Sequence, residues 1–285
     1  MFDFPIGVIL ESFREDRSTS IKKAAAMGAK GIQMYATSGD NAPENLNSAA
    51  RKALLDEVKG EGLVFSALCG DLGMGFGNPE KNPSLIEKSK RILDLAKELE
   101  TDIVTTHIGV VPTDPNHDRY KIMQDACFQL ASYADSLGSH FAIETGPEES
   151  AVLKGFLDAL GSTGVAVNLD PANLRMVSGE DPVQAVYNLQ KYIVHTHAKD
   201  GNQLIAVDPG YIYGVLHPVP QELEGKKFFE EVPLGTGSVC FPSYLKALED
   251  IGFRGFLTIE REVGNNPEAD IKTAFDFLKK TIKEN

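Results

Sequence analysis

The sequence has no tryptophan, only three cysteines and no long hydrophobic run. Cys69, Cys127 and Cys240 are odd in number and far apart, so they predict three scattered buried thiols in a reducing compartment, the cytoplasm, and no disulfide framework. No stretch approaches the roughly 20 apolar residues that a membrane span requires. The opening segment MFDFPIGVIL carries an acid and no basic region, so we expect a first strand there and not a signal peptide.

Basic residues are also scarce relative to acidic ones. Lys and Arg total 28 against 41 Asp and Glu, for a formal net charge of −13. This field repels nucleic acid and anionic membranes, so we expect neither as a partner. With 42% apolar residues over 285 positions, the chain can bury the core of a large globular protein.

Short β-rich runs alternate with segments of helical period along the whole chain. Eight strands alternating with eight helices predict an α/β fold, a (β/α)₈ TIM barrel in which residues 1–285 form a single domain. The long stretch 201–238 between the seventh and eighth strands breaks this rhythm, and it predicts a lid or substrate wall. The predicted strands are 6–10, 31–35, 63–69, 102–108, 140–144, 165–170, 192–198 and 255–260.

The last four predicted strands each end in a metal-binding type of side chain. These residues are Glu144, Asp170, His197 and Glu260. Catalytic groups of such barrels come from the carboxyl ends of the strands. Alternate residues of a strand point to the same side, and the apolar neighbours of these four have the opposite parity. All four side chains are therefore expected to point into the mouth of the barrel.

Three carboxylates that converge in a partly buried mouth repel one another unless a cation lies among them. One divalent ion bound by Glu144, Asp170, His197 and Glu260 would meet this need. Oxygen-rich ligation with one nitrogen suits Mn²⁺, Mg²⁺ or Co²⁺, whereas Zn²⁺ more often takes additional His or Cys ligands. We predict Mn²⁺ first, with the other three as alternatives.

Further polar residues are candidates for contacts to a substrate. His195 shares a strand face with His197 and is either a core histidine or a substrate-facing one, and Lys199 is either a solvated rim residue or a contact to a substrate oxygen. Tyr211 and Tyr213 in the long insertion either close over the substrate or simply pack. The remaining candidates for substrate binding are His107, Glu11, Gln33, Asp71 and Asn173.

With these residues in place, the chain resembles the xylose isomerase-like barrel superfamily, specifically its sugar phosphate isomerase/epimerase group. The resemblance covers nearly the whole length and is carried by IETGPE, NLDPANL, HTHAKDG and PLGTGSVCFPSYLKALEDIGFRGFLTIERE. It implies that Glu144, Asp170, His197 and Glu260 hold one divalent metal, and that the chain forms a homodimer or homotetramer. Asn173 stands where many ketose epimerases have a His, and Glu148 and Glu149 lie closer to the strand than the family's second acid.

The predicted function is a metal-dependent isomerase or epimerase of a sugar or sugar phosphate. Glu144 and Glu260 would transfer the proton while the metal stabilises an enediolate. A lyase or dehydratase, for example on 3-keto-glycosides, is the alternative with the same groups. An abasic-site endonuclease would need more than six histidines and a basic face, and a mere binding protein would not need two glutamates. Arg175 and Arg261 are the candidates for a phosphate contact.

Overall fold

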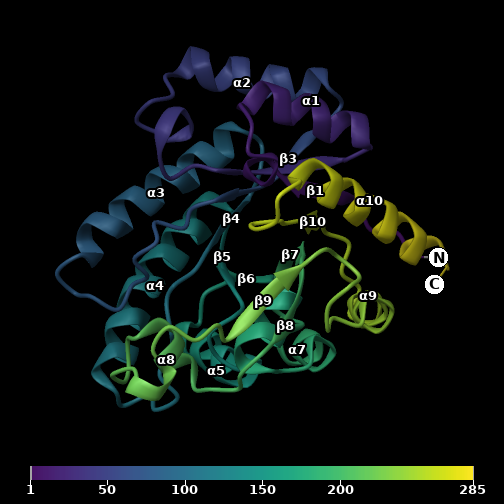
Figure 1. The fold of residues 1–285 in the computed structure, drawn as a ribbon. Helices are drawn as coiled ribbons and strands as arrows, with labels where there is room; N and C mark the ends of the chain where they lie inside the picture. Colours follow the sequence, from purple (N-terminus) through teal and green to yellow (C-terminus); the bar gives the residue numbers. More distant parts are fainter. Residues whose placement is uncertain (1, 285) are drawn as a thin grey trace.

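Eight parallel strands close into a barrel in the computed structural model, which describes residues 2–284 (Figure 1). Following the chain around the barrel, each strand pairs with the next, and the last pairs with the first. The predicted α/β TIM barrel is confirmed. Its strands are β1 (Ile6–Ile9), β2 (Gly31–Tyr35), β3 (Val64–Cys69), β4 (Ile103–Thr106), β5 (His140–Glu144), β6 (Val165–Leu169), β7 (Ile193–Ala198) and β10 (Leu257–Ile259).

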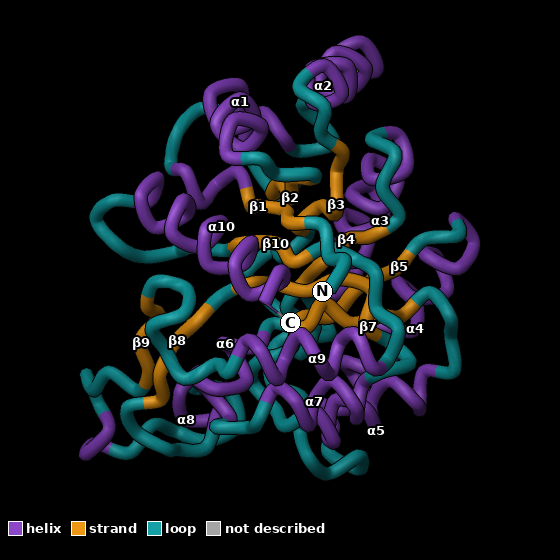
Figure 2. Tube along the Cα trace, turned by 90° about the vertical axis from the view of Figure 1, so that its right-hand side faces the viewer, coloured by secondary structure: helices purple, strands orange, loops and turns teal. Residues whose placement is uncertain are grey.

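Helices surround the strands on the outside (Figure 2). Polar caps start several of them: the Asp16 carboxylate, for example, accepts a hydrogen bond of 3.0 Å from the backbone N–H of Thr19. The longer helices are α1 (Arg17–Met27), α2 (Ser48–Gly60), α3 (Asn82–Glu98), α4 (Asp118–Leu137), α5 (Ser150–Leu160), α7 (Pro182–Leu189), α9 (Phe241–Asp250) and α10 (Pro267–Glu284). The short helices, of three to five residues, are η1 (Leu10–Phe13), η2 (Gly39–Asn41), α6 (Pro171–Asn173), η3 (Leu174–Ser178), α8 (Pro209–Tyr213) and η4 (Gln221–Leu223).

The two faces of the barrel strands differ in polarity. Side chains such as Ile143, Val167 and Leu257 are fully buried in the apolar layer between strands and helices. The interior of the barrel carries polar side chains instead, among them Gln33, Thr105, Asn168, His195 and Thr258. These interior groups are hydrogen-bonded to one another, which is the condition for burying polar side chains without a large penalty.

The long insertion between β7 and β10 is partly regular. Strand β8 (Asp200–Gln203) pairs antiparallel with β9 (Phe229–Val232), and α8 and η4 lie between them in the chain. We call this pair the β8–β9 ribbon. In Figure 1 it lies beside the carboxyl ends of β6 and β7.

Asp200 anchors this insertion to the barrel. Its buried carboxylate accepts hydrogen bonds from the backbone N–H groups of Gly201, Gly235, Gly237 and Val239 at 2.9–3.1 Å. Such charge-assisted bonds compensate for the lost hydration of the carboxylate. A Cβ atom at Gly237 would lie 2.3 Å from Asp200 Oδ1, so the close approach requires glycine there. The KDG and GTG segments of the sequence are therefore parts of one structural unit.

No helix within residues 2–284 combines the length and the apolar character needed to cross a membrane.

Candidate metal centre

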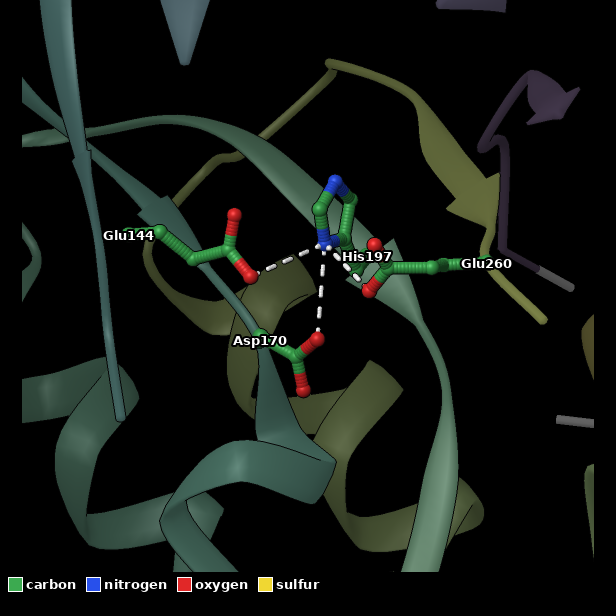
Figure 3. Close-up of side chains that lie close together, drawn as sticks. All are labelled: Glu144, Asp170, His197 and Glu260. Carbon is green, nitrogen blue, oxygen red and sulfur yellow. Dashed lines mark hydrogen bonds and ion pairs between the residues drawn. The ribbon is translucent and has the colours of Figure 1, made fainter. Parts of the chain in front are cut away.

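Four side chains converge at the carboxyl end of the barrel (Figure 3). Glu144 ends β5 and His197 lies near the end of β7, while Asp170 and Glu260 each directly follow a strand, β6 and β10. One donor atom of each residue lies within 4.8 Å of those of the other three. Each of the four is at most 7% exposed. The structure thus brings together the four residues that the strand ends predicted as ligands.

The spacing of the donor atoms suits a small divalent ion. The Nδ1 atom of His197 lies 3.1 Å from Glu260 Oε2, 3.4 Å from Asp170 Oδ2 and 3.5 Å from Glu144 Oε1. Opposite ligands of an octahedral ion the size of Mg²⁺ are about 4.2 Å apart, and adjacent ligands are closer. Three carboxylates and one imidazole are also a donor set that hard divalent ions accept. The residues present therefore fit a divalent metal ion.

The charges within the cluster favour a cation at its centre. Burial alone would lower the pKa of His197, but the carboxylates of Glu260 and Glu144 outweigh it and hold this pKa well above its ordinary value. Burial raises the pKa of Asp170. Burial also opposes ionisation of Glu260, yet the positive charges of Lys199 and His197 hold its pKa well below the usual range. Positive neighbours therefore keep Glu260 ionised, whereas Asp170 lacks enough of them to offset its burial, and a cation at the centre would favour its ionised form.

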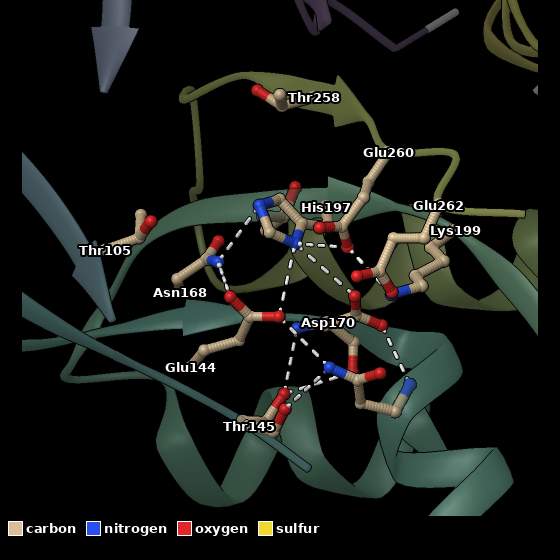
Figure 4. A network of polar contacts seen from close by, with 12 residues as sticks. Thr105, Glu144, Thr145, Asn168, Asp170, His197, Lys199, Thr258, Glu260 and Glu262 are labelled. Atoms are coloured by element: carbon tan, nitrogen blue, oxygen red, sulfur yellow. Dashed lines mark hydrogen bonds and ion pairs between the residues drawn. The ribbon is translucent and has the colours of Figure 1, made fainter. Parts of the chain in front are cut away.

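Contacts in the barrel interior determine which nitrogen of His197 faces the cluster. Its Nε2 lies 3.1 Å from Gln33 Oε1, and the Gln33 amide donates through Nε2 to Thr105 Oγ1 at 3.1 Å. These contacts hold Nε2 towards the barrel interior, so that Nδ1 is presented to the carboxylates. Asn168 Nδ2 lies 3.2 Å from the same Nε2 and donates to Glu144 Oε2 at 3.1 Å (Figure 4). Gln33, predicted to bind a hydroxyl, thus also orients a ligand.

His195 lies one layer deeper than His197 and is fully buried. Its Nδ1 donates to Asn168 Oδ1 at 2.8 Å, and its Nε2 accepts from Thr258 Oγ1 at 2.9 Å. Burial lowers its pKa well below the ordinary value, so the ring is neutral. The sequence left open whether His195 is a core histidine or a substrate-facing one, and in the structure it is a core histidine. The substrate contact expected of His195 is not present in this geometry, because both ring nitrogens are used within the core.

A cavity of about 420 Å³ opens above the cluster. His107, one residue beyond β4, lies there with Nε2 3.4 Å from Glu144 Oε1, and Asn173 Nδ2 donates to the same oxygen at 3.0 Å. Burial would lower the pKa of His107, but the Glu144 carboxylate and other acids raise it. The predicted substrate-binding residues that line the cavity are Gln33, Asp71, His107, Asn173 and Lys199.

Lys199 is buried, only 4% exposed, so its interpretation as a solvated rim residue is wrong. Its ammonium donates to Glu260 Oε2 at 3.0 Å and also to Glu262, which follows β10 (Figure 4). Burial would lower the pKa of Lys199, but the carboxylates of Glu260, Asp170 and Glu262 outweigh it and hold this pKa well above its usual value.

Glu11 does not reach this cavity. It lies in a neighbouring hollow with Arg14 and Arg261, and its Oε1 accepts from the backbone N–H of Tyr35 at 3.1 Å. Desolvation raises its pKa to about 7. The expected contact of Glu11 with a substrate hydroxyl is therefore not supported, because the Glu11 carboxylate accepts a hydrogen bond from the last residue of β2 instead.

The insertion supplies four lining residues that the sequence did not identify. Lys227, Phe229, Glu230 and Glu231 reach the cavity from the region of β9, and Tyr213, which the sequence did name, reaches it from α8. Tyr211 instead packs against His217, with ring centroids 5.4 Å apart. The length of the insertion indicated a wall, but no local pattern revealed the register of β9.

Glu148 is a further buried acid near the site. It is 7% exposed and borders a separate cavity of about 320 Å³, and its contact to the backbone N–H of Val111 is long, at 3.4 Å. Desolvation raises its pKa to about 7. His107 opposes this effect without outweighing it, so Glu148 differs from Glu144 and Glu260, whose pKa values are lowered.

Residues 21–281 match the family model described as xylose isomerase-like TIM barrel. One curated relative is an uncharacterised protein of Methanocaldococcus jannaschii, which is 23% identical over 70% of this chain and 64% of its own length. Another is the rhizopine catabolism protein MocC of Rhizobium meliloti, which is 32% identical over 50% of this chain and 42% of its own length. The chain thus spans less than two thirds of either relative.

Solved structures of other proteins share the fold over nearly the whole chain. A xylose isomerase domain protein of Planctomyces limnophilus has a TM-score of 0.79 at 24% identity, covering 99% of this chain and 98% of its own. A probable 3-DHS dehydratase, AsbF of Bacillus anthracis, has a TM-score of 0.73 at 19% identity, with 96% and 98% covered. A D-tagatose 3-epimerase-like protein has 0.75 at 17%, with 98% and 97% covered.

One further solved structure contains a metal ion. A xylose isomerase-like TIM barrel protein of Mycobacterium smegmatis, 14% identical with a TM-score of 0.72, was solved in complex with magnesium, and 100% of this chain and 99% of that one are covered.

Proposed function

The chain belongs to the family of xylose isomerase-like TIM barrels, and from this premise we propose that it is a divalent-metal-dependent isomerase or epimerase of a sugar. The observation that carries the proposal is the cluster of three carboxylates and one imidazole beneath an open cavity. Two of its members, Glu144 and Glu260, approach His197 Nδ1 from opposite sides (Figure 3). A substrate carbon above the cluster would thus have a carboxylate on either side.

When bound, a divalent ion would supply Lewis-acid stabilisation for the negative charge that develops on a substrate oxygen as a carbon-bound proton leaves. We propose Mn²⁺ as this ion, with Mg²⁺, Co²⁺ and Zn²⁺ as alternatives to be compared by activity after loading with each.

The proton transfer itself would be the work of the two glutamates. Burial opposes ionisation of Glu144, but the charges of His107 and His197 outweigh it and lower its pKa, so the carboxylate is in the basic form at neutral pH. Lys199 and His197 do the same for Glu260. Removal of a proton by one carboxylate and return by the other on the opposite face would epimerise the carbon. Return at the neighbouring carbon would isomerise an aldose and a ketose.

Two cavity residues are suited to hold the substrate during this transfer. His107 and Lys199 each have a nitrogen directed to a glutamate of the pair, at 3.4 Å and 3.0 Å, and each lines the cavity. Both can donate a hydrogen bond to a substrate oxygen. Asp170 and His197 would serve only to hold the ion.

The test is exchange of substrate hydrogen with D₂O. Metal-loaded protein incubated with a panel of ketoses and aldoses should introduce deuterium at carbon, detected by NMR and mass spectrometry. Glu144→Gln should reduce this exchange by roughly 10²–10⁴-fold, as expected for loss of a general base. Glu148→Gln is the matched control, because Glu148 is equally buried but lies outside the cluster, and it should retain exchange. Absence of exchange over a broad panel of sugars and sugar phosphates would contradict the proposal.

A lyase or dehydratase is the second candidate, favoured by the shared fold with the probable 3-DHS dehydratase. Elimination also begins with removal of a carbon-bound proton by a carboxylate, but a leaving group then departs. An unsaturated product in the same incubations, in place of an epimer or isomer, would favour this reaction.

Several expectations from the sequence stay predictions. They are the single-domain organisation of residues 1–285, a cytoplasmic location, the absence of nucleic-acid partners, and assembly as a homodimer or homotetramer. Size-exclusion chromatography with light scattering checks the last of these.

A further inference from the structure

We propose that the substrate of this site is an uncharged polyhydroxy compound, and that the acids of the β8–β9 ribbon exclude phosphorylated sugars. The inference rests on the proposed function and specifies its substrate class. It starts from the charges around the cavity.

Acidic side chains dominate the lining. Among residues 2–284, four lining carboxylates lie outside the metal cluster, in Asp71, Glu230, Glu231 and Glu262, in addition to Glu144 and Glu260. The lysines in the lining are Lys199 and Lys227. Both are already paired: Lys199 with Glu260 and Glu262, and Lys227 with Glu230 Oε2 at 3.2 Å. Even with a divalent ion bound, the walls would retain excess negative charge.

Two of the groups that proteins use to bind phosphate are missing from the described part of this lining, and its lysines are paired with acids. Besides lysine, phosphate is usually held by arginine forks or by the N-terminal N–H groups of helices. Within residues 2–284, no arginine lines the cavity, and no lining residue belongs to a helix of eight residues or more. Arg261 lies behind the wall, where its guanidinium is bound by Glu231 at 2.7 Å and Asp270 at 2.9 Å. Arg175 does not line the cavity either.

Glu231 is fixed in place on the ribbon. Its side chain is 6% exposed, and its Oε1 accepts from Arg261 Nη1 and from the backbone N–H of Glu262 at 3.1 Å. A carboxylate can only accept hydrogen bonds, so this wall suits the O–H groups of a sugar. A phosphate dianion, which offers only acceptors, cannot pair with it. Apolar lining residues such as Val177 and Phe229 suit the C–H faces of a neutral sugar.

Glu230 is the residue on which the inference can be tested. Its side chain is 36% exposed and its ion-pair partner is Lys227, two residues before β9, so its replacement leaves the four-residue cluster intact. Glu224 provides a matched control, because it is an exposed acid of the same insertion that does not line the cavity.

The experiment compares ketopentoses and ketohexoses with their terminal phosphates, for example D-fructose with D-fructose 6-phosphate. Calorimetric binding and D₂O exchange are measured on the full-length, Mn²⁺-loaded protein. In each pair that contains a ligand of the protein, we expect the neutral sugar to have a Kd at least tenfold lower than that of its phosphate. Glu230→Gln should reduce this ratio of Kd values by about tenfold, as expected for removing one charge near a dianion, and added salt should reduce it too. Glu224→Gln should leave the ratio unchanged.

The outcomes separate this inference from the proposed function. Equal or better binding of the phosphorylated sugars, or detectable binding by neither class, overturns the inference. If phosphorylated sugars exchange deuterium efficiently, the proposed function stands and the inference is wrong. If no sugar exchanges but neutral sugars bind selectively, the proposed function fails and the inference stands.

Discussion

Replacement of Asp170 by Asn should remove the stabilisation that a divalent ion gives to this protein. An ion that binds only the folded state at 100 times its Kd adds about 2.7 kcal/mol to the free energy of unfolding. For a chain of this size, 1 kcal/mol corresponds to a shift of about 2–4 °C in Tm. We therefore expect saturating metal to raise the Tm of the unsubstituted protein by about 5–10 °C, and to raise that of Asp170→Asn little or not at all.

Without metal, the same substitution should have no cost or a small benefit. Burial raises the pKa of Asp170, so the folded protein disfavours its ionised form. Asparagine removes this charge. Its side-chain oxygen can still accept the hydrogen bond of 2.8 Å from the backbone N–H of Asn173, which begins the turn after β6. The substitution removes one ionic contact, the one between Asp170 Oδ2 and His197 Nδ1 at 3.4 Å.

The assay is thermal unfolding with EDTA and then with Mn²⁺, Mg²⁺, Co²⁺ or Zn²⁺. Glu148→Gln is the control, because Glu148 is as buried as the cluster carboxylates but does not belong to the cluster, and it should keep the full metal-dependent shift. A full shift in Asp170→Asn would show that the ion binds elsewhere. Absence of any shift in the unsubstituted protein with all four metals would refute the reasoning.

Two further predictions concern buried carboxylates. Desolvation raises the pKa of Glu148 from 4.5 to about 7, so the folded state binds this proton more tightly. The contribution of Glu148 to the free energy of unfolding is therefore complete below about pH 4.5, and about 3 kcal/mol of it is lost as the pH rises to 7. Urea unfolding of Glu148→Gln should show no such loss of stability over this pH range. Identical pH profiles for the two proteins would contradict the prediction. Asp200→Asn should cost about 2–4 kcal/mol, because four backbone N–H groups lose a charged acceptor. Faster hydrogen exchange of residues 233–239 would report this loss, whereas unchanged exchange would contradict the anchoring role.

The barrel and the cluster of four candidate ligands could be predicted from local patterns. A strand has a period of two residues, and parallel strands of a barrel end at one rim. The identity of the last inward residue of each strand was therefore enough to predict that Glu144, Asp170, His197 and Glu260 meet. No long-range information was needed, because the regular fold itself determines the neighbours.

The surroundings of the cluster depended on contacts that no local pattern encodes. Gln33 orients His197 across 164 positions of the chain, and Lys199 is buried only because Glu260 and Glu262 come to it from β10. Sequence parity put His195 and His197 on one face, yet only the depth of each within the barrel made one a neutral core residue and placed the other among the carboxylates of the cluster.

The sequence by itself determined the order of strands, the rim at which the site lies and the acidic character of the molecule. The tertiary structure alone decided which acids form the wall of the cavity, because the register of β9 against β8 depends on the buried Asp200 and the backbone groups that close around it. Side-chain periodicity is a property of a single strand, whereas the partner of a strand in an irregular insertion is set by packing between distant segments.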